Sequence, residues 1–227
     1  MGNVMTSEFI LSVDLGKVRD FTAIAILEKR PPPTKAVHPD PRALRTIQVP
    51  IGPRPLHLRH LERVPKGTTY PAVVELVKGR LAALTDGPSR PALVVDHTGV
   101  GVAVVDLFEA AKLQPYAITI TGGDTVSDEG RHWRVPKREL VTSTQLAMQN
   151  GRLRFAATLA DLPTLEQELA SFNYKLSDAG HDSYASWRER DHDDLVLAVA
   201  MAVWYADYTP KRVYYDDHDA VSWTSFS

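Results

Sequence analysis

The sequence has no cysteine among its 227 residues, which excludes disulfide bonds, thiolate metal sites and cysteine nucleophiles. It also has no run of 18 apolar residues, so no segment is long enough for a transmembrane helix. The opening stretch, MGNVMTSEFILSVD, lacks the basic segment and the long apolar segment of a signal peptide. These absences favour a protein of the reducing cytoplasm.

The chain also has little net charge, −2 at pH 7, although 24% of its residues are charged. The whole chain therefore gives no sign of a nucleic-acid-binding protein, and such a function has to rest on local groups of basic residues. With 44% hydrophobic residues, the chain is long enough for one substantial domain. We expect that domain to span residues 1–208.

The order of apolar segments predicts a mixed α/β fold. Two short apolar strands, residues 9–13 and 21–27, are separated by a short link that favours an antiparallel hairpin. A third strand is expected within residues 44–64. Further on, strands and helices alternate in the order typical of parallel βαβ units. These segments are a helix over 70–84, a strand over 92–96, a helix over 99–111 and a strand over 117–120.

The remaining segments are less regular. Residues 31–43 are rich in proline and predict a surface loop, and residues 124–136 predict a polar loop. Together with Gly122 and Gly123, that second loop is a candidate flap over a binding site. Helices are expected over 137–150 and 162–171, a two-stranded excursion over 172–188, and a long apolar helix from residue 195. The tail, residues 209–227, is expected to be poorly ordered.

Carboxylates stand at the ends of three of these apolar segments. Asp14 ends the first strand, Asp96 ends the strand over 92–96, and Asp191, Asp193 and Asp194 precede the last helix. In open α/β sheets, ligands bind outside the carboxyl ends of strands, so Asp14 and Asp96 can converge. Asp191 and Asp194 would share one face of a helix, whereas Asp193 would point elsewhere.

Each carboxylate also has a purely structural interpretation. Asp14 could cap the turn that follows it, and Asp96 could cap the next helix. Acidic residues in the first turn of a helix are favoured by the helix dipole. The functional hypothesis rests on the joint pattern, because like charges buried together need protons or cations to balance them. Oxygen ligands suit Mg²⁺ or Mn²⁺, and a pair of such ions can clamp a phosphodiester.

Five segments, in this order, resemble the nuclease domain of the phage terminase large subunit. They are VDLGKVRDFTAIAILE, LVVDHTGVGVAVVDLF, ITITGGD, VPKRELVTSTQLAMQNGRL and RDHDDLVLAVAMA. The resemblance implies a ribonuclease H-like fold, with a central mixed sheet and helices on both faces. It also implies that Asp14, Asp96 and Asp194 bind two divalent cations, Mg²⁺ or Mn²⁺, with Asp191 or Asp193 as an auxiliary ligand.

The resemblance also implies an activity and partners. Domains of this family cut concatemeric double-stranded DNA during viral genome packaging, together with a packaging ATPase, a portal and a small terminase subunit. A viral protein in the host cell cytoplasm is therefore expected. The chain departs from the full-length family in one respect, because it contains no GxxxxGK[ST] phosphate loop. The ATPase is thus expected on a separate polypeptide or outside this chain.

Basic residues near the carboxylates are candidates for DNA contacts. The segment GRHWRVPKR, residues 130–138, contains Arg131, Arg134, Lys137 and Arg138, and Lys17 and Arg19 follow Asp14. A solvated charged loop is the alternative for each of them. Lys137 stands at a helix start, where the helix dipole disfavours positive charge, and this favours a functional role.

The expected function is a DNA endonuclease that uses two metal ions and has low sequence specificity. In the expected mechanism, one ion between Asp14 and Asp96 activates water, and another between Asp14 and Asp194 stabilises the leaving oxygen. Three alternatives stay open. They are a nuclease resembling Holliday-junction resolvases, an ATP-binding protein of the actin-like or sugar-kinase type, and a non-catalytic module that docks DNA or a motor.

Overall fold

The computed structural model describes residues 6–16, 20–37, 47–84, 90–178 and 193–208. The strands are β1 (Glu8–Asp14), β2 (Thr22–Lys29), β3 (Thr34–Val37), β4 (Ile47–Pro50), β5 (Leu56–Val64), β6 (Ala92–Asp96), β7 (Tyr116–Thr121), β8 (Ser127–Glu129), β9 (His132–Pro136) and β10 (Leu153–Phe155). The helices are α1 (Tyr70–Ala82), α2 (Gly101–Ala110), α3 (Lys137–Gln149), α4 (Leu162–Asp178) and α5 (Asp194–Tyr208).

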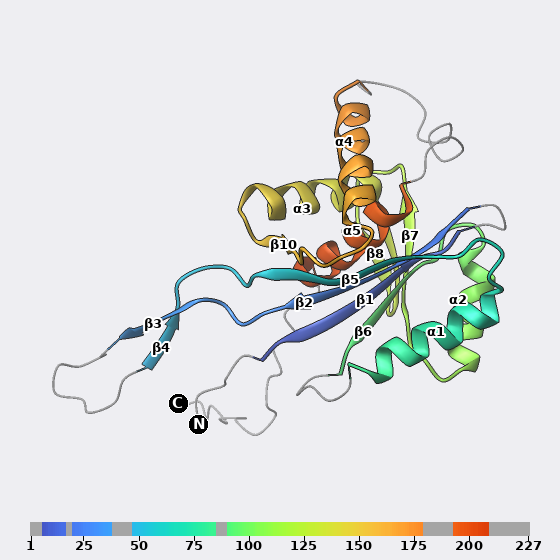
Figure 1. Ribbon diagram of the computed structural model, residues 1–227, viewed down its shortest axis with the longest axis horizontal. Coiled ribbons are helices and arrows are strands. Elements are labelled where there is room, and N and C mark those ends of the chain that lie inside the picture. Colours follow the sequence, from blue (N-terminus) through green and yellow to red (C-terminus); the bar gives the residue numbers. More distant parts are fainter. Residues whose placement is uncertain (1–5, 17–19, 38–46, 85–89, 179–192, 209–227) are drawn as a thin grey trace, which may run out of the picture.

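Eight of the strands form one mixed sheet in the order β10-β5-β2-β1-β6-β7-β9-β8. β1 pairs with β2, and β2 with β5, in antiparallel directions, whereas β1, β6, β7 and β9 run parallel to one another. The predicted hairpin and the predicted βαβ order are therefore both confirmed. With helices on both faces of this sheet (Figure 1), the structure has the ribonuclease H-like fold class that the sequence predicts.

The side chains of β1 divide the interior into two cores. Ile10 belongs to a core shared with α3, α4 and α5, whereas Leu11 and Val13 belong to a core shared with α1 and α2. This division follows from the two-residue alternation of a strand. β6 is apolar along its length because helices cover both of its faces, as is typical of buried parallel strands.

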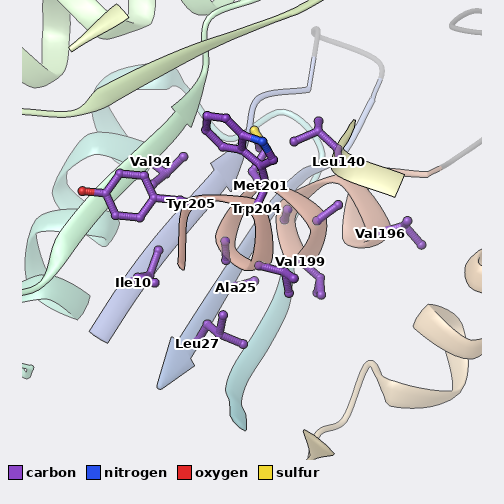
Figure 2. Packing of buried hydrophobic residues seen from close by; sticks show 14 of the residues in the cluster. Ile10, Ala25, Leu27, Val94, Leu140, Val196, Val199, Met201, Trp204 and Tyr205 are labelled. Atoms are coloured by element: carbon purple, nitrogen blue, oxygen red, sulfur yellow. The ribbon is translucent and has the colours of Figure 1, made fainter. Parts of the chain in front are cut away.

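Helix α5 is buried on every side, which explains why its sequence is apolar all round. Figure 2 shows its side chains packed above β1 and β2, with Val199 near Ala25 and Leu27. The Ser12 hydroxyl of β1 donates a hydrogen bond of 2.5 Å to the Ala198 carbonyl. Small side chains on α5 and on the strands beneath it let the helix backbone approach the sheet. Among the described residues, no helix is long and apolar enough to cross a membrane.

The polar loop predicted for residues 124–136 is wrong over most of its length. β8 and β9 form an antiparallel pair there, and β9 also extends the main sheet beside β7. The segment HWRVP alternates in the manner of a half-buried strand, because Trp133 and Val135 are buried while His132 and Arg134 are exposed. The many charged residues around it obscured this alternation.

Two other predicted segments also need correction. Residues 172–178, expected in a two-stranded excursion, continue helix α4. Leu165, Leu169, Phe172 and Leu176 in fact follow helical spacing, and residues 179–188 lie outside the described part of the chain. Within the predicted proline-rich loop, Thr34–Val37 forms β3, which pairs with β4 in a separate two-stranded sheet projecting from the end of β2 and β5 (Figure 1). The rest of that loop beyond residue 37, and the tail 209–227, lie outside the described residues.

Candidate functional site

Two buried carboxylates meet at the carboxyl ends of the central parallel strands. Val13 of β1 pairs with Val95 of β6, so the next residues, Asp14 and Asp96, lie side by side on neighbouring strands about 4.8 Å apart. Both side chains project to the face covered by α5, as do Ile10 and Val94. Asp14 is 6% exposed and Asp96 is 5% exposed, and their carboxyl groups share a hydrogen bond.

Glycines in the loops after β1 and β6 allow the backbone to pack closely beside Asp14 and Asp96. A Cβ atom on Gly16 would lie 2.4 Å from the Phe21 carbonyl oxygen, and one on Gly101 would lie 2.0 Å from the Asp96 carbonyl oxygen. The Gly16 amide donates a hydrogen bond to the Thr22 hydroxyl, so this contact stabilises the turn after Asp14. The Leu15-Gly16 sequence is therefore explained by close packing of the backbone.

The Asp96 carboxylate is oriented by the loop that follows β6. The Thr98 amide donates to Asp96 Oδ1 at 2.8 Å, and the Thr98 hydroxyl donates to the same oxygen. That hydroxyl also accepts a hydrogen bond from the Ile120 amide of β7 at 3.0 Å. Val100, and not Asp96, is the N-cap of α2, so Asp96 orders its own loop instead of capping the helix.

Helix α5 brings further carboxylates to the same place. Asp194, the first residue of α5, is 9% exposed, and its charge acts on Asp14. Asp193 precedes it, and its backbone carbonyl accepts a hydrogen bond from the Leu197 amide at 2.9 Å. The Asp193 side chain turns toward α3, where it pairs with the Lys137 ammonium at 3.2 Å.

The grouping of these charges changes the protonation of Asp14. Burial raises the pKa of Asp14 well above its usual value, and the negative charges of Asp96, Asp194 and Asp193 raise it further. The hydrogen bond between the Asp14 and Asp96 carboxyl groups also raises this pKa, because such a bond needs a proton on one partner. A cation between the two carboxylates would replace that proton.

An arginine and a glutamate, neither predicted from the sequence, orient the start of α5. Ala23 of β2 pairs with Asp14 of β1 on one side and with Arg63 of β5 on the other. Arg63 therefore lies on the same face of the sheet as Asp14, beyond the small side chain of Ala23. Its guanidinium forms an ion pair with Glu168 of α4 and lies 3.7 Å from an oxygen of Asp194. Glu168 accepts a hydrogen bond of 3.0 Å from the Val196 amide, which belongs to the first turn of α5.

Glu168 is 7% exposed, and burial raises its pKa to about 7 against the opposing effects of the Val196 amide and Arg63. The sequence does contain one signal for this residue. Glu168 stands three residues after Leu165, on the buried side of an amphipathic helix, where a charge is unusual.

The site as a whole has an excess of negative charge. Its five carboxyl groups are Asp14, Asp96, Asp193, Asp194 and Glu168, and the basic residues Arg63 and Lys137 form ion pairs with members of this group. In the described part of the chain, no three His, Asp or Glu side chains are already arranged as ligands of one ion. The arrangement is thus a cluster of hard oxygen donors, the ligand type that divalent cations prefer.

The predicted basic residues lie in different places. Lys137, at the first turn of α3, is 9% exposed and belongs to the site. Arg138 pairs with Asp124 at 2.6 Å, and Arg134 is exposed on β9. Arg131 precedes β9, two strands away from Asp96, and its guanidinium binds Gln114 and not the carboxylates. Three other predicted residues, Lys17, Arg19 and Asp191, lie outside the described residues.

No protein-family model matches this sequence, and no curated protein sequence matches it. Among solved structures, the chain is similar to one described as the human cytomegalovirus terminase nuclease domain. The TM-score is 0.47 and the sequence identity is 11%, over 92% of this chain and 88% of that chain.

Proposed function

We propose that this chain is a metal-dependent DNA endonuclease of viral genome packaging. The observation that carries the proposal is the placement of Asp14, Asp96 and Asp194, three buried carboxylates at the carboxyl ends of β1 and β6 and at the start of α5. The ribonuclease H-like sheet and the five segments that resemble terminase nuclease domains support the same conclusion.

The donor set fits a divalent cation. Carboxylate oxygens are the ligands that Mg²⁺ and Mn²⁺ prefer, and the raised pKa of Asp14 beside Asp96 marks a place where positive charge is favoured. Asp14, Asp96 and Asp194 would hold the ions, with Asp193 or Asp191 as an auxiliary ligand. When bound, a pair of such ions lowers the pKa of water and stabilises the leaving oxygen of a phosphodiester.

The surrounding residues would hold this site in its working geometry. Arg63 and Glu168 fix the start of α5 and with it Asp194, and the Thr98 amide and hydroxyl fix Asp96. The Lys137 ammonium, beside Asp193, offers a positive charge to a DNA phosphate that approaches the carboxylates. A phosphate contact positions DNA without reading its sequence, so cleavage would show little sequence preference.

The packaging role implies partners that this chain does not supply. Because the sequence has no phosphate loop for ATP, the packaging ATPase would be a separate polypeptide or a part outside this chain. The portal and the small terminase subunit would be further partners, as the resemblance implies. The DNA substrate would be a double-stranded concatemer.

The test is cleavage of a supercoiled plasmid with Mn²⁺, with Mg²⁺ or with EDTA. The wild-type protein should nick and linearise the plasmid only with metal, and Asp96→Asn should abolish cleavage. Asp106→Asn is the matched control, because Asp106 is an exposed aspartate of α2 on the opposite face of the sheet. Metal-independent cleavage, or equal cleavage by Asp96→Asn, would contradict the proposal.

The same preparations separate the alternatives. Preferential cleavage of a four-way junction over linear duplex DNA would indicate a resolvase. Hydrolysis of ATP without DNA cleavage would indicate an ATP-binding protein of related fold. DNA binding without either reaction would indicate a docking module.

A further inference from the structure

A second hollow lies at the opposite end of the sheet from the carboxylates. Its volume is about 470 Å³, within the range of small-ligand sites, and it is bounded by the end of α1, the start of β6, the turn between α2 and β7, and Tyr205 of α5. Figure 2 shows Tyr205 and Val196 at opposite ends of α5. At 1.5 Å per residue, the eleven steps from Asp194 to Tyr205 place the two sites about 16 Å apart.

The charged residues of this hollow are all basic. Lys78, Arg90, Lys112 and Arg131 line it, and no aspartate or glutamate does. Lys78 lies 3.5 Å from Glu75, whereas Arg90, Lys112 and Arg131 form no ion pair within the described part of the chain. Glu109 lines an adjoining hollow that shares Lys112 and Arg131, so one carboxylate lies near the rim.

Arg131 is held in a fixed orientation. Its guanidinium donates hydrogen bonds to the backbone carbonyl and the side-chain oxygen of Gln114, at 2.7 Å and 3.2 Å. It also lies 4.4 Å from the ring centre of Tyr116, which packs against Tyr205 at 4.8 Å. A guanidinium has five N–H donors, so three remain for a ligand, and little side-chain entropy is lost when one binds.

Lys112 adopts a backbone conformation that normally favours glycine. It has a φ of 61° and is the only non-glycine residue with positive φ among those described. The Lys112 amide donates to the Glu109 carbonyl and the Leu113 amide donates to the Phe108 carbonyl, which is the Schellman pattern at the end of α2.

The end of α3 has the same hydrogen-bond pattern, but there glycine occupies the position with positive φ. The amides of Gly151 and Arg152 make the equivalent pair of hydrogen bonds, and Gly151 has a φ of 62°. A lysine at this position is strained where a glycine is not. Strain of this kind clusters at functional sites, and the Lys112 side chain lines the hollow.

We propose that this basic hollow binds the phosphate group of a nucleotide, either free or at the end of a DNA strand. Phosphate carries more than one negative charge and matches the planar donors of arginine, and several basic residues without acidic partners supply the complementary charge. The site is separate from the carboxylate cluster and does not depend on the nuclease proposal.

The first test is titration calorimetry of the wild-type protein with pyrophosphate in EDTA, so that no metal bridges the ligand to the carboxylates. Saturable binding is expected, and Arg131→Gln and Lys112→Gly should each weaken it by about tenfold. Lys112→Gly is informative because glycine suits the backbone there, so its melting temperature should be no lower than that of the wild-type protein. Lys35→Gln, on the projecting β3, is the matched control and should bind as the wild-type protein does.

The second test distinguishes the two sources of the phosphate. Oligonucleotides with a 5′ phosphate or a 5′ hydroxyl, and a deoxynucleoside triphosphate, are titrated in the same buffer. Preference for the 5′-phosphorylated strand would identify a DNA end as the ligand, and binding of the triphosphate alone would identify a free nucleotide. Absence of saturable binding by every probe, or binding that Lys112→Gly and Arg131→Gln leave unchanged, would overturn the proposal.

Discussion

Glu168 makes the stability of the metal-free protein depend on pH in an unusual direction. Its pKa is raised from 4.5 to about 7 in the folded protein, so the folded state holds a proton that the unfolded state has released. For an acid with a raised pKa, stability is highest when the group is protonated and falls as the pH rises toward the folded pKa.

The magnitude follows from the size of this shift. The raised pKa of Glu168 is equivalent to about 3 kcal/mol of unfolding free energy before solvent screening is allowed for. With that allowance, the protein should lose about 2 kcal/mol of stability between about pH 5 and about pH 8. Glu168→Gln keeps an oxygen that can accept the Val196 hydrogen bond but cannot ionise. The stability of Glu168→Gln should therefore fall by about 2 kcal/mol less over this pH range than that of the wild-type protein.

The assay is urea denaturation of both proteins in EDTA at several pH values, followed by circular dichroism. The free energy of unfolding of the wild-type protein should fall from pH 5 to pH 8 by about 2 kcal/mol more than that of Glu168→Gln. The difference between the two profiles isolates Glu168 from Asp14, whose raised pKa acts in the same direction. Parallel profiles, or a wild-type protein that gains more stability with pH than the variant, would refute the reasoning.

Three further predictions concern the elements that build the site. Asp14→Asn cannot ionise beside Asp96, Asp194 and Asp193, so in EDTA it should raise the urea midpoint increasingly as the pH rises, while it abolishes plasmid cleavage; a lowered midpoint would contradict the charge argument. Gly101→Ala should destabilise the protein by about 2–3 kcal/mol, because its Cβ atom would overlap the Asp96 carbonyl. In the same denaturation assay, Gly79→Ala in α1 should stabilise the protein by about 0.5–1 kcal/mol, because no atom lies within 4 Å of the added Cβ. Ser12→Ala removes the buried hydrogen bond to the Ala198 carbonyl and should cost about 1 kcal/mol, and a change below the error of the assay would show that this bond does not help to hold α5 on the sheet.

The central part of the fold could be predicted because its local patterns agree with its tertiary environment. β1, β2 and β6 are short, mainly apolar runs bounded by polar turns, and burial on both faces is the reason for such runs. The positions of Asp14 and Asp96 could also be predicted, because each ends one of these runs and parallel strands end at the same edge of the sheet.

Other features depend on contacts between residues far apart in the sequence. Arg63 and Glu168 meet from β5 and α4, 105 residues apart, and nothing in the spacing of either segment predicts that they meet. β10 has only three residues, which is too short for a periodic pattern. The sequence predicts a loop in place of β9 because the exposed residues of this strand are polar or charged, although Trp133 and Val135 alternate with them as buried residues.

Binding of Mn²⁺ tests the account most directly, because the proposed reaction depends on the carboxylates as a cation site. The measurement is calorimetric titration of Mn²⁺ into the wild-type protein, Asp96→Asn and the control Asp106→Asn at pH 7.5. We predict saturable binding by the wild-type protein and by Asp106→Asn, and binding weaker by about tenfold or more in Asp96→Asn. Equal binding by all three proteins, or no binding by the wild-type protein, would contradict the assignment of Asp14, Asp96 and Asp194 as a metal site.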